Sequence, residues 1–243
     1  MKVLLGSGGL RSDERRELCR NEMRSHFGDI DRILFVPWAV VDHDWYVQRI
    51  VEAGLNAGYE IDGIHTHADP VKAIEDAQGI YVGGGNTFLL TRQLHRTSVI
   101  ATIRKRVLEE GLPYMGVSAG SNVACPTMQT TNDMPVVFPG SFEALGLVPF
   151  QVNAHYYPGS IWIKEDDEFQ QHFGETREDR IREFHQHNAT PVVGLCEGAF
   201  LRCNGDTIQL VGGQATLFQA GKDPLILTAN FNNSSLLNLN HRY

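Results

Sequence analysis

Short apolar runs alternate with longer amphipathic ones along the first half of the chain, and this alternation constrains the fold more than any other feature. Brief apolar runs are typical of strands in a parallel sheet, because helices cover both faces of such a sheet. Predicted strands occupy residues 2–6, 32–37, 59–65, 79–82 and 113–117. Predicted helices occupy residues 12–26, 44–57 and 69–77, with further helical sequence up to residue 110. This order predicts an α/β fold in which a mostly parallel sheet is flanked by helices.

The second half of the chain has a different pattern. Residues 126–165 are rich in Pro, Gly, Thr and Asn, and a charged helix is predicted over residues 176–187. Four short apolar runs then follow at the spacing of a β meander: 192–196, 199–203, 208–211 and 216–219. Two of its turns would lie at residues 204–205 and 212–213. Since the chain contains no linker, repeat or low-complexity tract, we expect residues 1–243 to form a single domain with a C-terminal β meander.

Composition limits the classes of partner. The chain of 243 residues carries a formal net charge of −8, so its surface repels phosphate backbones and nucleic acid is not an expected partner. No apolar run reaches the roughly 18 residues that a membrane-spanning helix needs. The first residues turn charged by Arg11, unlike a signal peptide. The four cysteines have neither metal-site nor disulfide spacing: Cys19, Cys125, Cys196 and Cys203. We therefore expect buried free thiols and a cytoplasmic location.

The most informative motif is the pentapeptide 116–120, Gly-Val-Ser-Ala-Gly, which follows a predicted strand and begins an apolar stretch. In this strand–turn–helix context, a G-x-S-x-G sequence exposes the serine hydroxyl, here that of Ser118, at the carboxyl edge of a sheet. The turn is tight enough to require glycine on either side of the serine. The N–H of Ala119 would point at an oxyanion, helped by the helix dipole. The alternative is an ordinary glycine-rich turn, since the bare pattern often occurs by chance.

A run of three glycines, 83–85, follows the predicted strand 79–82 and precedes Asn86, a suitable helix N-cap. Such a loop can present backbone N–H groups inward, and Gly85 could supply a second oxyanion donor. The competing interpretation is a nucleotide phosphate loop, but a G-x-G-x-x-G pattern fails at Phe88 and no Gly-Lys-Ser/Thr follows. The glycine segment at residues 6–9 fails the same test, because Arg11 occupies the last glycine position.

A serine nucleophile needs a histidine that takes its proton and an acid that orients the histidine. His155 ends an apolar, strand-like segment before a Pro-Gly turn, and a parallel-sheet enzyme places its working groups at strand ends. Two acids could orient it. Glu197 ends the predicted strand 192–196 beside a glycine, whereas Asp133 lies in a polar loop where a surface acid is the default. The other nine histidines lie in polar sequence or near element ends, where surface or capping roles are expected: His26, His43, His65, His67, His95, His172, His185, His187 and His241.

Several motifs in combination resemble those of the peptidase E family, from about residue 60 almost to the C-terminus. They are GGGNTF, GVSAGSN, ACPT, TTNDMP, a histidine in VNAHY, GETRE and GLCEG, in that order. The resemblance implies an α/β fold related to class I glutamine amidotransferases, with serine in place of their nucleophilic cysteine. It also implies a serine exopeptidase that removes N-terminal aspartate from dipeptides through an aspartyl-enzyme intermediate, without metal or cofactor.

Carried over motif by motif, the resemblance implies these roles: nucleophile Ser118, base His155, orienting acid Glu197 with Asp133 as its rival, and oxyanion donors Gly85 and Ala119. In the GETRE motif, Arg177 would pair with the aspartate side chain of the substrate. The alternative for Arg177 is an ordinary helix surface, since Glu178 and Arg182 have the spacing of an i,i+4 ion pair. The chain order Ser–His–Glu differs from that of α/β-hydrolases, so the shared elbow is convergent geometry.

Three positions depart from the family pattern. Val117 stands where an aromatic residue is expected, Phe138 replaces an acid and Ala154 replaces a proline. They lie close to the expected site, so they bear on substrate preference more than on chemistry.

Three rival functions remain open. A cyanophycinase-like peptidase would cleave an aspartyl-arginine polymer, but GGGN in place of GGxQ disfavours it. A glutaminase would need cysteine at position 118. A non-catalytic nucleotide-binding module would use the glycine loops for phosphate. A small peptide is the expected partner, and the sequence gives no indication of oligomeric state.

Overall fold

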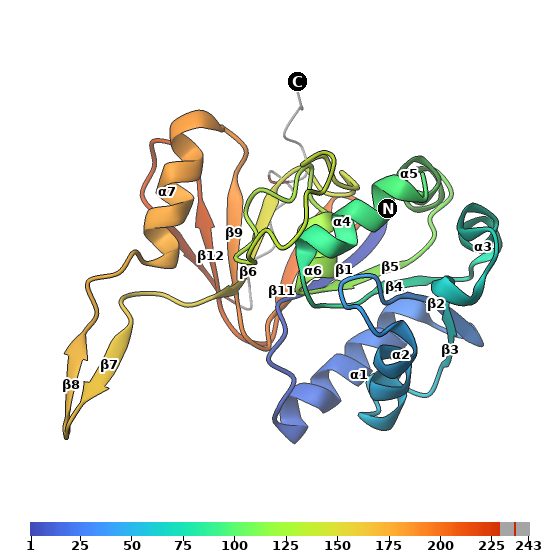
Figure 1. Ribbon diagram of the computed structural model, residues 1–243, viewed down its shortest axis with the longest axis horizontal. Coiled ribbons are helices and arrows are strands. Elements are labelled where there is room, and N and C mark those ends of the chain that lie inside the picture. The colour runs from blue at the N-terminus through green and yellow to red at the C-terminus, as the bar shows by residue number, and fades with distance from the viewer. Residues whose placement is uncertain (229–235, 237–243) are drawn as a thin grey trace.

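A seven-stranded sheet forms the centre of the molecule (Figure 1). The computed structural model describes residues 1–228 and residue 236. The strands of this sheet are β1 (Lys2–Gly6), β2 (Arg32–Val36), β3 (Glu60–Gly63), β4 (Ile80–Val82), β5 (Tyr114–Val117), β10 (Phe200–Asn204) and β11 (Thr207–Val211). They lie in the order β11-β10-β1-β5-β4-β2-β3. The five strands β1 to β5 are parallel, and β10 and β11 extend the sheet in antiparallel fashion. The prediction of an α/β fold with a mostly parallel sheet is confirmed.

Helices cover both faces of this sheet (Figure 1). They are α1 (Asp13–Phe27), α2 (His43–Glu52), α3 (Pro70–Asp76), α4 (Thr87–Arg96), α5 (Ile100–Leu108), α6 (Ala119–Val123) and α7 (Arg177–His187), with a short 3₁₀ helix at Ile64–Thr66. Alternate residues of β1 face opposite sides. Leu4 packs with α1 and α2, whereas Val3 and Leu5 pack with α3, α4, α5 and α6. Within residues 1–228 and residue 236, the helices are too short or too polar to cross a bilayer.

A second, four-stranded sheet packs beside the first. Its strands are β6 (Gln151–Tyr156), β9 (Val192–Cys196), β12 (Ala215–Phe218) and β13 (Leu225–Leu227), in the order β13-β12-β9-β6. β6 and β9 are parallel neighbours, so their carboxyl ends meet at one edge. α7 packs on this sheet through Ile181, which contacts Tyr156, Val192 and Phe218. The largest hydrophobic cluster contains residues of both sheets.

The expected C-terminal meander requires a correction. The four strands form where the sequence predicts them, but they are divided between the two sheets. Of these four strands, β10 and β11 form a hairpin with each other, while β9 and β12 pair with each other in the second sheet. Gly212 and Gly213 carry the chain from one sheet to the other, with φ of 62° and 45° that favour glycine. A Cβ on Gly213 would lie 2.7 Å from that of Ala199, so the crossing also needs close backbone approach.

A small hairpin that the sequence did not predict extends away from both sheets. It consists of β7 (Trp162–Glu165) and β8 (Glu168–Gln171), which pair only with each other. Figure 1 shows it at the lower left, connected to the body by extended chain at both ends. Its two ends lead back to β6 and to α7.

Candidate active site

The serine of the pentapeptide lies in a strained turn between β5 and α6. Ser118 has φ of 55° and ψ of −111°, a conformation that costs a non-glycine residue of order 1–3 kcal/mol. A side chain on Gly116 would collide with the carbonyl of Gly120, and one on Gly120 with the carbonyl of Val82. The glycines on either side are therefore required by backbone contacts, as the sequence predicts.

His155 reaches the serine from the second sheet. Its Nε2 lies 2.7 Å from Ser118 Oγ. The residue ends β6 at a bulge and has φ of 57°. Its backbone N–H donates to Ser7 Oγ at 2.8 Å, and the Ser7 hydroxyl donates to the carbonyl of Leu195 at 2.7 Å. Ser7 thus ties the bulge of β6 to the neighbouring strand β9.

Glu197 completes a line of three side chains. It follows β9 directly, and its Oε1 lies 2.7 Å from His155 Nδ1. With Nδ1–H donating to the carboxylate, Nε2 is free to accept the hydroxyl proton of Ser118. About two fifths of the surface of both the His155 and Glu197 side chains is exposed, at 41% and 40%. The structure therefore brings together three of the predicted site residues in the geometry that nucleophilic catalysis needs.

A glycine loop after β1 leaves room for this line, a role that sequence reasoning missed. A Cβ on Gly8 would lie 2.7 Å from the imidazole carbon Cε1 of His155, and one on Gly9 would collide with Glu197 Oε2. The sequence of this segment suggests only a phosphate loop. A signal was available, because β1 and β5 are parallel neighbours and both glycine-rich turns follow their carboxyl ends.

Asp133 does not contact the histidine. Its Oδ2 accepts hydrogen bonds from the N–H of Thr87 at 2.7 Å, the Thr87 hydroxyl at 2.6 Å and the Thr131 hydroxyl at 3.1 Å. The carboxylate therefore lies at the start of α4, where the helix dipole favours a negative charge. The preceding residue, Asn132, donates a hydrogen bond to the carbonyl of Ala154 at 2.7 Å. Residues 130–133 thus connect the start of α4 with the strand that carries His155.

The glycine run 83–85 lies against the serine. A Cβ on Gly84 would be 3.1 Å from that of Ser118, and Gly85 has φ of 132° with the Ala39 carbonyl where a side chain would stand. Asn86 caps α4 as predicted, accepting from the N–H groups of residues 88 and 89. In the described part of the chain, the N–H groups of Gly85 and Ala119 have no hydrogen-bond acceptor. Gly85 is exposed, whereas Ala119 is fully buried beneath the serine turn.

Arg177 is the first residue of α7 and lies near the end of β6. Its guanidinium carbon is 5.5 Å from the ring centroid of Tyr157, two residues after the histidine. Its Nε is enclosed without a hydrogen-bond partner among residues 1–228 and residue 236. The predicted helix-surface pair exists, with 2.5 Å between Arg182 and Glu178, but it does not include Arg177.

Among the other histidines, His26 differs from expectation. It is buried rather than exposed, and its Nε2 contacts the carbonyl of Tyr114 at 3.0 Å. Burial is the main cause that lowers the pKa of His26 to about 3, so the ring is neutral at physiological pH. His65 and His67 instead pair with acidic side chains near the surface. His241 lies outside the described residues.

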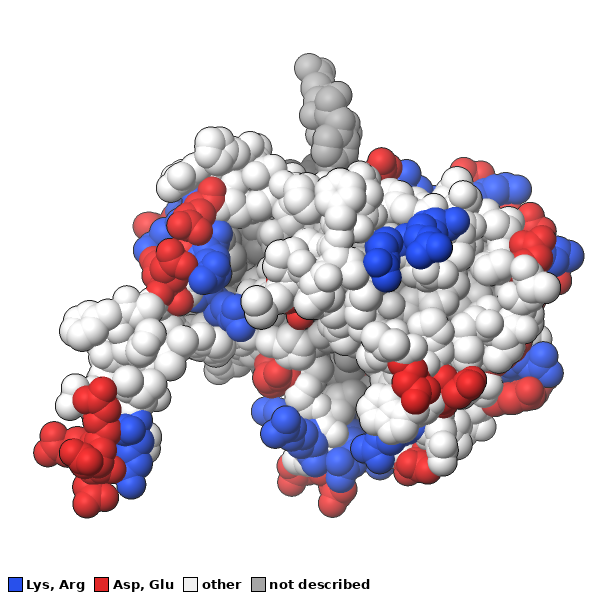
Figure 2. Space-filling view, in the orientation of Figure 1, with Lys and Arg blue, Asp and Glu red and all other residues white. Residues whose placement is uncertain are grey.

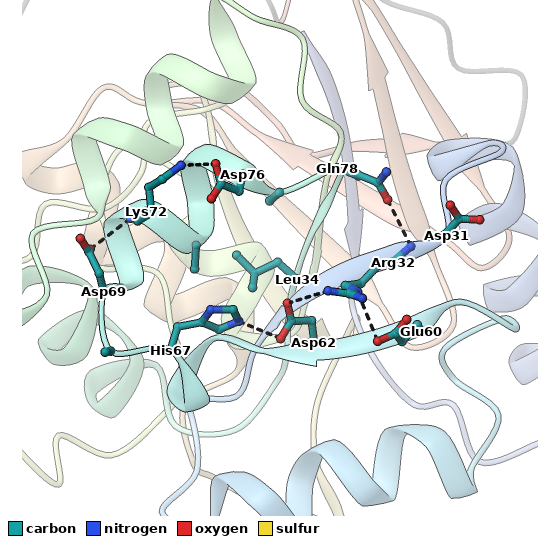
Figure 3. A pocket seen from close by; sticks show the side chains of 13 residues that line it. Asp31, Arg32, Leu34, Glu60, Asp62, His67, Asp69, Lys72, Asp76 and Gln78 are labelled. Atoms are coloured by element: carbon teal, nitrogen blue, oxygen red, sulfur yellow. Dashed lines mark hydrogen bonds and ion pairs between the residues drawn. The ribbon is translucent and has the colours of Figure 1, made fainter.

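A hollow of about 590 Å³ lies elsewhere, towards the amino ends of β2 and β3 (Figure 3). Most of its charged groups pair with one another. Asp62 lies 2.8 Å from His67 and 3.8 Å from Arg32, and Lys72 pairs with Asp76. The elbow, by contrast, follows the carboxyl end of β5. The hollow contains none of the predicted site residues.

The three departures from the family pattern differ in exposure. Val117 and Ala154 are buried, at 7% and 1%, at the ends of the strands that carry the serine and the histidine. Phe138 is 81% exposed. Of the three, only Phe138 presents its side chain to solvent.

Three of the cysteines are buried free thiols, as expected, and the fourth, Cys196, is half-buried. Burial raises the pKa of the Cys19 thiol to about 12. The described residues contain no group of three His, Cys, Asp or Glu that could hold a metal ion.

Comparison with known proteins places the chain in a family. The sequence model of the family described as "Peptidase family S51" matches residues 3–211 of this chain. A peptidase E of Streptomyces coelicolor is 46% identical over 212 residues, covering 86% of this chain and 83% of the relative. A Drosophila melanogaster protein named "Probable alpha-aspartyl dipeptidase" is 42% identical over 221 residues, covering 90% of this chain and 89% of that one.

Solved structures support the fold. A putative peptidase E from Listeria monocytogenes superposes with a TM-score of 0.61 at 20% identity, covering 86% of this chain and 97% of that one. A peptidase from an acI-B1 actinobacterium gives 0.63 at 18% identity, with 96% of each chain covered. With the match over residues 3–211 and relatives above 40% identity, the chain belongs to peptidase family S51.

Proposed function

We propose that this serine-type peptidase hydrolyses dipeptides with N-terminal aspartate. The observation that carries the proposal is the line of hydrogen bonds from Ser118 through His155 to Glu197, with 2.7 Å at each step. Nucleophile, base and orienting acid stand in this order in serine hydrolases on unrelated folds. The relatives named peptidase E and probable alpha-aspartyl dipeptidase support the choice of substrate.

The reaction would proceed by acyl transfer. Ser118 Oγ attacks the scissile carbonyl carbon while His155 Nε2 takes the hydroxyl proton. The C–N bond then breaks as His155 gives this proton to the departing amine, leaving an aspartyl ester on the serine. Water attacks the ester, again losing a proton to His155, and aspartate leaves as the serine is reprotonated. Glu197 keeps the imidazole in the required tautomer and stabilises the imidazolium.

The oxyanion would accept hydrogen bonds from the N–H groups of Ala119 and Gly85. Ala119 follows the serine directly, and Gly85 follows Gly84, which lies against the serine; neither N–H has an acceptor within the described residues. The loss of one such donor typically costs about 2.7–4 kcal/mol of transition-state stabilisation. Asp133 would act indirectly, because its hydrogen bonds to Thr87 fix the helix start that follows the Gly85 loop.

Arg177 would bind the side-chain carboxylate of the substrate. Its enclosed, unpartnered Nε and its place over Tyr157 support this role, since a buried guanidinium nitrogen without a partner is costly. A single cation of this kind explains how a chain with net charge −8 attracts an acidic substrate. The free cysteines support a cytoplasmic location. The acidic surface disfavours nucleic acid, which supports a small peptide as the partner.

The glycine loops give little support to a nucleotide-binding module. The segment at residues 6–9 lies against His155 and Glu197, and the run 83–85 against Ser118. Phosphate bound at either loop would lie beside the carboxylate of Glu197 or on the serine itself. The same loops therefore fit the peptidase better than the nucleotide site.

Hydrolysis of a matched substrate set tests the proposal. Asp-Leu, Glu-Leu, Asn-Leu, Ala-Leu and N-acetyl-Asp-Leu would be compared with wild type and Ser118→Ala. Cleavage confined to free Asp-Leu and lost in the variant is the expected result. Substantial turnover by Ser118→Ala would sink the mechanism, and equal cleavage of Ala-Leu would sink the specificity.

The role of Arg177 has a matched control on the same helix. Arg177→Gln should raise KM for Asp-Leu by on the order of 100-fold, as expected for a lost charge-assisted pair. Arg182→Gln removes the same charge from the exposed pair with Glu178 and should leave KM unchanged. Equal effects of the two substitutions would indicate a general field rather than a binding contact.

A further inference from the structure

The hairpin of β7 and β8 has no cover within the described chain. All eight residues of its two strands are exposed, and it pairs with neither sheet. In Figure 1 it stands clear of the body of the molecule. An isolated two-stranded hairpin is marginally stable in water, so this element gains most of its stability only when another surface packs on it.

Its aromatic side chains gather on one face, whereas Ile163 points to the other. The register sets Trp162 opposite Gln171, and Lys164 opposite Phe169. Since residues two apart share a face, Trp162 and Phe169 lie on the same side. Phe173, two residues beyond Gln171, follows the same alternation. The three aromatic side chains are 60%, 67% and 105% exposed, and together they form an exposed apolar patch.

The tip of the hairpin is acidic. Four consecutive carboxylates, at residues 165–168, form the turn and its flanks, and Lys164 is the neighbouring cation, 3.6 Å from Asp167. Figure 2 shows this group as a red patch at the end of the projecting element. The hairpin thus combines an aromatic face with a negative tip.

A surface with the opposite properties lies along α4. Arg92 is half-buried and Arg96 is exposed, and neither has an acidic partner within residues 1–228 and residue 236. Figure 2 shows blue surface near the end of this helix without red beside it. The loop at residues 134–143 runs along the same helix, because Asn86 donates to the carbonyl of Met134 and His95 contacts that of Glu143.

This loop supplies the apolar part of the surface. It exposes Met134, Val136, Phe138 and Phe142 at 76%, 59%, 81% and 51%. The apolar loop could pack against the aromatic face of the hairpin, and the arginines of α4 have the charge opposite to that of its acidic tip. We call the two together the α4 surface, formed by Arg92, Arg96 and the loop at residues 134–143.

We propose that the hairpin is a dimerisation arm, which lies on the α4 surface of a second copy of this chain. The aromatic face would cover the loop, and the acidic tip would meet the two arginines. Both halves of the contact are present in one chain, so a two-fold axis allows each copy to give an arm and receive one, which closes the assembly. The two arms would bury roughly 900 Å² of their own aromatic surface and cover a similar area of the α4 surfaces. The sum of the two areas falls in the range of roughly 1,200–2,000 Å² that stable interfaces bury.

Sedimentation across the micromolar range, at low and high salt, tests the arm. Wild type should be a dimer, and Trp162→Ser with Phe169→Ser should be a monomer with unchanged circular dichroism, because both side chains are mostly exposed in one chain and contribute little to its core. A wild type that stays monomeric would overturn the proposal and leave the arm to a different partner. A dimer that survives the double substitution would overturn it as well.

Charge reversal tests which surfaces meet. Asp167→Lys with Glu168→Lys, or Arg92→Glu with Arg96→Glu, should each weaken dimerisation at least about tenfold, and mixing the two variants should restore it as a heterodimer. Arg24→Glu with Arg49→Glu makes the same change of charge on exposed arginines of α1 and α2 and should have no effect. Failure of the mixture to associate would overturn the assignment of the α4 surface.

Discussion

The serine side and the histidine side of the site are held in place in different ways. Ser118 is fixed by its own turn, because the glycines two residues before and after it meet backbone atoms at once. His155 and Glu197 are fixed by distant segments, through the hydroxyl of Ser7 and the clearance that Gly8 and Gly9 leave. One side is determined by local sterics and the other by tertiary contacts, so they should respond differently to substitution.

Gly120→Ala should give the largest effect and act on folding itself. The added methyl group would collide with the backbone carbonyl of Val82, which no side-chain movement relieves. We expect more than about 4 kcal/mol of lost stability, measured by thermal or denaturant unfolding. Gly111→Ala is the control, since its φ of 76° strains a side chain but nothing stands within 4 Å. An active, stable Gly120→Ala would show that the elbow is not held by sterics.

Glu197→Gln should act on catalysis and leave folding intact. The amide cannot stabilise the imidazolium of His155, and loss of an orienting carboxylate lowers kcat by up to about 10⁴-fold. The side chain is 40% exposed, so the melting temperature should not change. Steady-state kinetics and calorimetry would be compared with Glu143→Gln, an exposed acid paired with Arg104. Equal activity in both variants would remove Glu197 from the proposed triad.

Gly9→Ala should lower kcat on the order of 100-fold, because it pushes the Glu197 carboxylate away and small misplacements are costly in catalysis. Gly205→Ala is closely matched, with φ of 56° against 69°, and nothing within 4 Å of its new side chain. Both should lose similar stability. If kcat fell equally in both, backbone strain rather than contact with Glu197 would explain the loss.

Asp133→Asn should give a smaller effect on activity with a clear effect on stability. It weakens the hydrogen bonds to Thr87 and Thr131, at a cost of about 1–3 kcal/mol, or a few degrees in melting temperature. Thr131→Val removes a single donor and should cost less. A loss of activity as deep as that of Glu197→Gln, without a stability change, would return Asp133 to the role of orienting acid.

The smallest effect on stability at neutral pH is expected for a substitution of His26. This histidine is buried, whereas His155 is partly exposed. Burial lowers the pKa of His26 to about 3, so the unfolded chain binds its proton more readily. The stability that the neutral ring contributes is full above pH 6.5 and is lost as pH falls towards 3, up to roughly 5 kcal/mol. His26→Gln keeps a donor for Tyr114 and should unfold at lower pH. An unchanged acid midpoint would contradict this.

The elements could be predicted because their signals are local. Apolar runs and caps such as Asn86 placed the strands and helices of the first half close to where they lie. The elbow follows from steric rules that concern five residues. Which sheet a strand joins is a different matter, because β9 and β10 are both short and apolar and only their packing partners separate them.

The missed features share this cause. The loop at residues 6–9 matters through the side chains that it leaves room for, and those lie about 150 and 190 residues further along the chain. The sequence around Asp133 is typical of a surface acid, and only the fold shows that its carboxylate accepts a hydrogen bond from the start of α4. The hairpin of β7 and β8 has polar and apolar residues mixed on both strands, so neither strand shows a clear alternation.

The hydrogen bond from Ser7 to Leu195 spans 188 residues, and it has a consequence for when the enzyme becomes active. During synthesis Ser118 and His155 leave the ribosome before Leu195, which anchors the Ser7 hydroxyl, and before Glu197, which orients the imidazole. Contacts of such long sequence separation form late in folding, since loop closure must come first. A nascent or truncated chain that ends before β9 would therefore carry its nucleophile without the means to use it, and peptidase activity would appear only with the completed molecule.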